Sequence, residues 1–118
     1  MKMTPPNDLE FLAFFEVEPT MLDPGVPWVY NTLTYLTERD GYVVRFQISP
    51  SYSTLKVAVS FGGHEIADVE LTAFTDLQIL IEGGRETLIA RFGETTASGL
   101  FLTLKPMVRI ALIASSDA

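Results

Sequence analysis

The sequence is poor in the residues that build metal and disulfide sites. It has 118 residues, no cysteine and one histidine, His64. Disulfide scaffolds and cysteine-based zinc sites are therefore excluded, and so is a histidine-rich metal centre. Basic residues are also few, with 8 lysines and arginines against 15 acidic residues and a formal net charge of −7. We expect no cofactor. We also expect no nucleic-acid partner and no membrane partner, because phosphates would be repelled.

Long hydrophobic segments are missing as well. The apolar run Ile110–Ala114 is far shorter than the roughly 20 residues that span a bilayer. The N-terminal stretch is interrupted by Glu10 and does not have the pattern of a secretory signal. We expect a cytoplasmic protein with a single domain over residues 1–118, in which residues 1–8 form a flexible tail.

Signatures of catalysis are not found. The sequence has no Walker A or dinucleotide-binding glycine motif. A Ser-His-Asp triad would depend on His64, which lies in a glycine-rich turn. The carboxylate pairs Glu16/Glu18 and Asp68/Glu70 could serve acid–base chemistry or hold a hard cation, but they are also typical of a solvated strand face. The protein is therefore interpreted as a non-enzyme.

Alternation of apolar and polar residues is the dominant pattern. Asp40-Gly41 predicts a two-residue hairpin in which Arg39 opposes Tyr42 and Tyr35 opposes Phe46. Gly83-Gly84 predicts a second one, which places oppositely charged residues across from each other. These cross-strand pairs are Glu82 with Arg85 and Asp76 with Arg91.

A third hairpin is predicted around Gly62-Gly63-His64 as a three-residue loop. This loop length places Phe61 opposite Glu65, and it aligns Val57 with Val69 and Lys56 with Glu70. A two-residue loop would place Val57 opposite Asp68, which spoils the apolar match.

The last part of the chain predicts strands over 100–104 and 108–113, with a bend, bulge or edge position at Pro106. Residues 11–18 are ambiguous: Phe11, Ala13, Phe15 and Val17 alternate as in a strand, whereas a cap at Asn7 or Asp8 would suit a short helix. We favour the strand. The predicted fold is all-β: an antiparallel meander of seven to nine strands forming a β-sandwich or flattened barrel.

Several apolar residues fall on the outward face of this predicted meander. They either form an exposed patch for a partner or belong to central strands buried on both faces. These residues are Leu36, Ile66, Leu80, Ile89, Phe101 and Ile113.

Aromatic and unpaired acidic residues mark a candidate protein interface. Trp28 and Tyr30 follow a proline-rich loop, and they are compatible with core packing as well as recognition. The candidate interface residues are Glu16, Glu18, Asp23, Trp28, Tyr30 and Asp68.

Three functions fit these observations. The first is an acidic protein-binding module, such as a bacterial immunity or inhibitor protein whose charge attracts a basic toxin. The second is an assembly subunit that self-associates, for example as a homodimer, through strand edges or an apolar sheet face. The third is a carrier that holds a small apolar ligand in a cavity.

Overall fold

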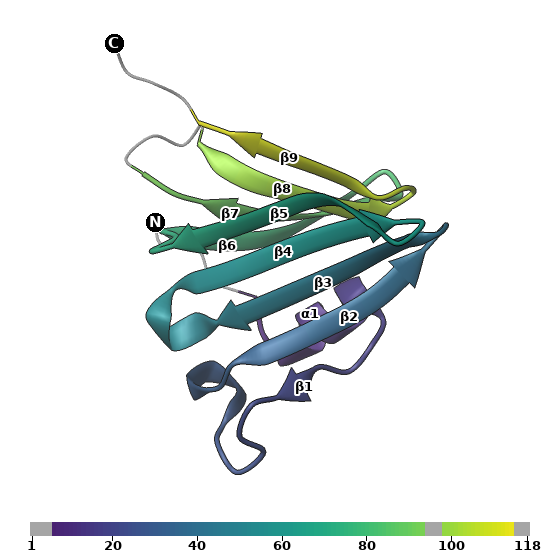
Figure 1. Cartoon of the computed structure of the whole chain (residues 1–118). Coiled ribbons are helices and arrows are strands. Elements are labelled where there is room, and N and C mark those ends of the chain that lie inside the picture. The colour runs from purple at the N-terminus through teal and green to yellow at the C-terminus, as the bar shows by residue number, and fades with distance from the viewer. Residues whose placement is uncertain (1–5, 94–97, 115–118) are drawn as a thin grey trace.

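Over its described residues, the protein folds as two antiparallel β-sheets with one short α-helix (Figure 1). The computed structural model describes residues 6–93 and 98–114. A five-stranded sheet has the order β1-β2-β3-β4-β5, and a four-stranded sheet has the order β6-β7-β8-β9. The elements are α1 (Asp8–Phe15), β1 (Thr20–Met21), η1 (Trp28–Tyr30), β2 (Leu33–Arg39), β3 (Tyr42–Ser49), η2 (Pro50–Tyr52), β4 (Thr54–Phe61), β5 (His64–Thr72), β6 (Asp76–Glu82), β7 (Arg85–Arg91), β8 (Gly99–Lys105) and β9 (Arg109–Ile113).

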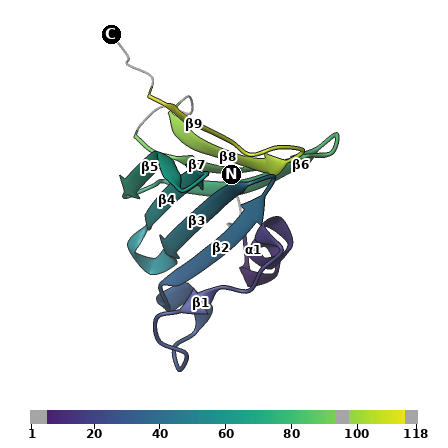
Figure 2. The same ribbon diagram turned by 45° about the vertical axis from the view of Figure 1, so that its right-hand side comes forward.

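Within each sheet every strand pairs only with strands that adjoin it in sequence. The predicted all-β antiparallel meander is therefore confirmed, and its two sheets pack in a sandwich-like arrangement (Figures 1 and 2). The core lies between the sheets and includes Leu33, Phe46 and Val57 from one sheet and Leu88 and Leu102 from the other.

The prediction of a strand over residues 11–18 is wrong, because Asp8–Phe15 forms helix α1. Asn7 and Glu10 make a capping box: the Asn7 side chain accepts from the Glu10 backbone N–H at 2.9 Å, and the Glu10 carboxylate accepts from the Asn7 N–H at 3.2 Å. Of the expected tail, residues 1–5 lie outside the described residues, whereas Asn7 and Asp8 belong to the start of this helix.

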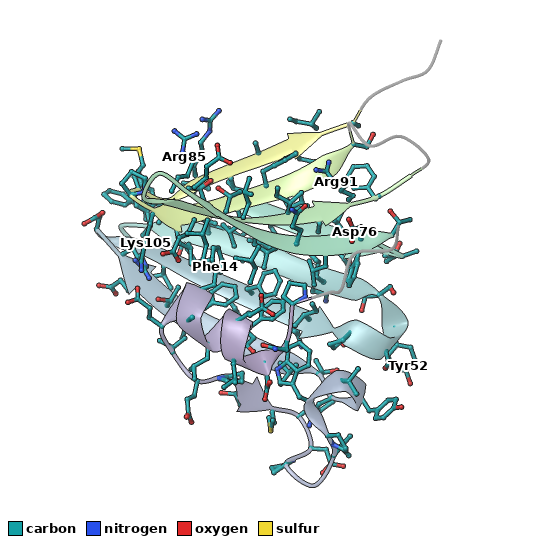
Figure 3. All side chains as sticks on the ribbon, turned by 180° about the vertical axis from the view of Figure 1, so that it is seen from behind. Phe14, Tyr52, Asp76, Arg85, Arg91 and Lys105 are labelled. Atoms are coloured by element: carbon teal, nitrogen blue, oxygen red, sulfur yellow. The ribbon has the colours of Figure 1, made fainter. Side chains whose placement is uncertain are left out.

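Helix α1 is held by three phenylalanines that its period places on one side. The Phe11 and Phe15 rings lie 5.8 and 4.7 Å from the Tyr35 ring, and the Phe15 ring lies 5.0 Å from that of Phe46. Phe14 projects from α1 toward the four-stranded sheet (Figure 3). The helix thus covers the β2–β3 part of the inner face of the five-stranded sheet, next to the four-stranded sheet.

The two-residue hairpin predictions are confirmed. Tyr35 lies opposite Phe46 and Arg39 opposite Tyr42, and φ is +52° at Asp40 and +86° at Gly41, as a type I′ turn requires. In the β6–β7 hairpin, Glu82 lies opposite Arg85 and Asp76 opposite Arg91.

The three-residue loop predicted between β4 and β5 is wrong. The turn has two residues and places Phe61 opposite His64. A β-bulge next to Val59 and Ser60 then leaves Ile66 without an opposite residue. The extra residue restores the predicted alignment beyond the bulge, so Val57 lies opposite Val69 and Lys56 opposite Glu70.

The outward apolar residues divide between the two expected outcomes. Ile89 is buried, because it lies on β7, inside the four-stranded sheet. Phe101, on β8, is half-buried. The remaining four are exposed: Leu36, Ile66, Leu80 and Ile113.

Candidate functional site

The predicted interface residues fall on two opposite edges of the five-stranded sheet. Five of them lie on the segment 16–30, which runs from the end of α1 past β1 to η1. Asp68 lies on β5, at the other edge of the same sheet. The structure therefore groups Asp23, Trp28 and Tyr30 in the loop before β2. It places Glu16 beside Arg39 at the other end of β2 and Asp68 at the opposite edge of the sheet.

The Glu16 carboxylate is engaged within the chain. Glu16 ends α1 in a left-handed conformation, with φ of +60°. It forms an ion pair with Arg39 and another with Lys105 at 3.4 Å, and Lys105 also contacts Glu86 at 3.3 Å. The hydrogen bond and the charge of Arg39, followed by the charge of Lys105, hold the pKa of Glu16 below its usual value. Glu16 thus ties α1 to both sheets.

Trp28 anchors the loop that also carries Asp23 and Tyr30. Its indole Nε1 donates to the Tyr35 hydroxyl at 3.1 Å, and its ring lies 5.3 Å from that of Phe11. Burial raises the pKa of the Tyr35 hydroxyl, while the hydrogen bond from Trp28 acts in the opposite direction. Trp28 is half-buried, so its main contacts are with the core, and the exposed residues beside it are held in place.

Asn31 fixes the shape of the same loop. Its side-chain amide donates to the backbone carbonyls of Asp23 at 2.6 Å and Val26 at 3.0 Å. Its oxygen accepts from the backbone N–H groups of Asp23 and Thr32 at 3.2 and 2.9 Å. Asn31 is buried, and the Asp23 carboxylate accepts from the Gly25 N–H at 3.1 Å. The loop is therefore preorganised by hydrogen bonds.

An exposed apolar surface lies on this rigid support. Tyr30 on η1 and Tyr52 on η2 are 68% and 77% exposed, and the two 3-10 helices are in contact. Tyr52 points away from the body of the protein (Figure 3). We call this surface the apolar corner and define it by four exposed residues: Leu22, Val29, Tyr30 and Tyr52. Exposed tyrosines on a rigid support are typical anchors of protein interfaces.

Tyr52 was not among the predicted interface residues. The sequence does place this aromatic residue in a Pro-Ser-Tyr-Ser turn between two strands, which is a signal that could have marked it as a candidate. What the sequence pattern does not reveal is that η2 lies against η1, because this contact joins two loops through the folded sheet.

The acidic charge is concentrated on one half of the molecule. Among the described residues, α1 and the five-stranded sheet with their loops carry ten acidic and three basic residues. The four-stranded sheet with its loops carries three acidic and four basic residues, again counted over the described positions. The acidic half therefore has a net charge of −7, while the other half has a net charge of +1.

Sites for chemistry are not apparent in the described residues. Over 6–93 and 98–114, no group of three or more His, Cys, Asp or Glu residues is placed to hold a metal ion. A hollow of about 350 Å³ is lined by Leu80, Glu82, Gly83, Arg85 and Thr87. It is an open surface feature of the β6–β7 hairpin, unlike the enclosed apolar cavity that a ligand carrier needs.

A membrane-spanning helix is not found either. In the part of the chain that the structure describes, no helix has both the length and the hydropathy needed to cross a bilayer.

Comparison with known proteins gives a likeness of fold. No family model matches the sequence, and none of the curated proteins matches it. Among solved structures, the fold is similar to a chain of the contact-dependent growth inhibition toxin–immunity protein complex from Klebsiella pneumoniae 342. The TM-score is 0.75 at 19% sequence identity, and the match covers 91% of this chain and 92% of the other. The chain thus shares its fold, over 91% of its length, with a component of a toxin–immunity complex.

Proposed function

We propose that this protein is an immunity protein, which binds a bacterial toxin domain and neutralises it. The observation that carries the proposal is the likeness of fold to a chain of a toxin–immunity complex over 91% of this chain. Its other features fit a binding role. The acidic half offers a charged surface, and the apolar corner offers rigid aromatic side chains for contact. We infer that the protein acts by binding and is not an enzyme.

The proposed partner is a basic toxin domain. A toxin that degrades nucleic acid needs positive charge to bind phosphate, and this charge would be attracted by the −7 half of the immunity protein. Complementary charge mainly accelerates association, whereas buried aromatic anchors mainly slow dissociation. On this proposal the protein works in the cytoplasm, where such a toxin would meet its target.

The direct test is protection from a toxin. Each reading frame that adjoins this gene is expressed in a sensitive bacterium with and without the protein, and surviving cells are counted. Survival with the protein, together with binding of the purified pair, is the expected result. The Klebsiella pneumoniae 342 toxin serves as a specificity control and should not be neutralised, because 19% identity leaves few contact residues in common. Equal killing with and without the protein would overturn the proposal.

Two sets of variants separate charge from anchoring. The triple variant E38Q/E65Q/D68N removes three exposed charges from the acidic half, and it should slow association about tenfold and reduce its salt dependence. The variant Y30A/Y52A should instead speed dissociation. Matched controls on the other half are E82Q for the charge and M107A for the exposed apolar surface, and both should bind like the wild type.

A further inference from the structure

The two sheets expose four edge strands, and three of them are poorly suited to pairing with another chain. These edges are β1, β5, β6 and β9. Strand β1 has only two residues. Strand β5 carries exposed Glu65, Asp68 and Glu70 as well as the bulge at Ile66. Strand β6 begins at Asp76 and ends at Glu82. Shortness, charge and bulges are the devices that keep edge strands from pairing.

Strand β9 has fewer of these protections within its described residues: no bulge interrupts its pairing with β8, and neither its middle nor its C-terminal end carries a charge. Its sequence is Arg-Ile-Ala-Leu-Ile, with its only charge at Arg109. One side of β9 pairs with β8, and its other side is the edge of the four-stranded sheet (Figure 1). Leu112 and Ile113 are 53% and 47% exposed there. An apolar, regular edge of this kind is a template for another strand.

We propose that β9 pairs antiparallel with β9 of a second copy of this chain, so that the two four-stranded sheets join into one continuous sheet. A two-fold axis at Ala111 would place Ile110 opposite the partner's Leu112 and Arg109 opposite the partner's Ile113. This pairing sets Ile110, Ala111 and Leu112 against apolar residues of the second copy and keeps the two arginines apart.

The distribution of charge favours a second copy as the occupant. Two copies that met through their −7 halves would repel each other. The four-stranded sheet belongs to the half with a net charge of +1, where two copies can approach with little repulsion. The acidic half and the apolar corner, which includes residues of η1 and η2, remain free to bind a partner. The β9 pairing does not itself require the proposed function. Its consequence does rest on the proposed function, namely that each dimer would bind two toxin domains.

The first test measures the mass in solution across micromolar concentrations by sedimentation velocity. We expect the wild type to approach twice 13.1 kDa as concentration rises. The variants L112K and I113K introduce a charge into the edge, and each should weaken the dimer about tenfold or more. The matched control I81K places the same charge on exposed β6, at the opposite edge of the same sheet, and should leave the dimer unchanged.

A second measurement needs no substitution and so does not depend on folded variants. Backbone amide exchange of the segment 109–113 is followed in the wild type at low and high concentration. Slower exchange at high concentration, confined to this segment, is expected. A wild type that stays monomeric throughout, or a dimer that tolerates both L112K and I113K as folded proteins, would overturn the proposal.

The two proposals fail in different ways. A dimer that does not protect cells would contradict the immunity function and leave the β9 pairing intact. If the wild type is monomeric and L112K alone loses toxin binding, then β9 receives a strand of the toxin and the second copy is the wrong occupant. If L112K becomes monomeric and still protects, both proposals hold.

Discussion

The indole N–H of Trp28 donates to the hydroxyl of Tyr35 at 3.1 Å, which fastens the loop before β2 to the inner face of that strand. The Tyr35 side chain is buried, so the bond lies where water competes poorly. This contact links the core to the loop that carries part of the apolar corner. Its removal should therefore change both the stability of the core and the order of that loop.

The variant Y35F should lower the free energy of unfolding by about 1–2 kcal/mol, because it leaves the Trp28 N–H without its acceptor. Thermal or urea unfolding measures the change. The control is Y42F, which removes a hydroxyl from a half-buried tyrosine of the adjacent strand β3, and it should change stability by less than about 0.5 kcal/mol. Equal effects of the two variants would show that the hydrogen bond is unimportant.

Asn31 should be sensitive even to a conservative change. The variant N31D keeps an oxygen that can accept from Asp23 and Thr32, but it loses the donated bonds to the carbonyls of Asp23 and Val26. Destabilisation of about 2 kcal/mol is expected, since a charge is also placed in a buried position. Faster amide exchange in the loop 22–32 would accompany it. An N31D protein with wild-type stability and amide exchange would contradict the role assigned to the Asn31 hydrogen bonds.

Glu16 should contribute to the pH dependence of stability. Its pKa is lower in the folded state, chiefly because of Arg39, so the unfolded state binds the proton more readily. The stabilisation is therefore present above the unfolded value of 4.5 and is lost as the pH falls through the folded value. We expect E16Q to be less stable than the wild type at neutral pH and to converge with it in acid.

Unfolding curves at a series of pH values measure this convergence. The control E18Q removes an exposed charge two residues away and leaves the ion pairs with Arg39 and Lys105 in place. A constant difference between E16Q and the wild type at every pH would refute the assigned ion pairs.

Gly41 should tolerate alanine less well than Gly63 does. Both glycines have positive φ, +86° and +81°, so both variants incur a backbone cost of about 1 kcal/mol. A Cβ on Gly41 would also lie 2.9 Å from Cε2 of Phe61, whereas a Cβ on Gly63 meets nothing within 4 Å. Denaturant unfolding measures the loss of stability in G41A and in G63A. The amount by which the loss in G41A exceeds that in G63A is the cost of displacing the Phe61 ring. Equal losses of stability would contradict the packing at this turn.

The hairpin register at Asp40-Gly41 was predictable from the turn residues and the apolar match. At Gly83-Gly84 it was predictable because charge and hydrophobic pattern agreed. The β4–β5 hairpin shows where this reasoning stops. A bulge at Ile66 and a longer loop shift the strand by the same one residue, so they give the same apolar alignment beyond Val59. The side-chain pattern therefore cannot distinguish a bulge from a longer loop, whereas the strand register in the structure does.

Helix α1 was missed for a similar reason. Phe11 and Phe15 fit both an alternating strand and a helical face, but Phe14 fits only the helix, and Asn7 and Glu10 had the spacing of a capping box. At the candidate site, the loop with Asp23, Trp28 and Tyr30 could be found from its residue types. The contact of η1 with η2, which adds Tyr52, depends on the completed sheet and could not.

The meander has a consequence for folding. Since every strand pairs with a strand next to it in sequence, the loops to be closed within each sheet are short, and folds with such local pairing form faster than other all-β folds. Each hairpin can also close as soon as its second strand has left the ribosome. The strands that support the apolar corner, β2 and β3, adjoin each other near the start of the chain, so this support can begin to assemble while β6–β9 are still being synthesised.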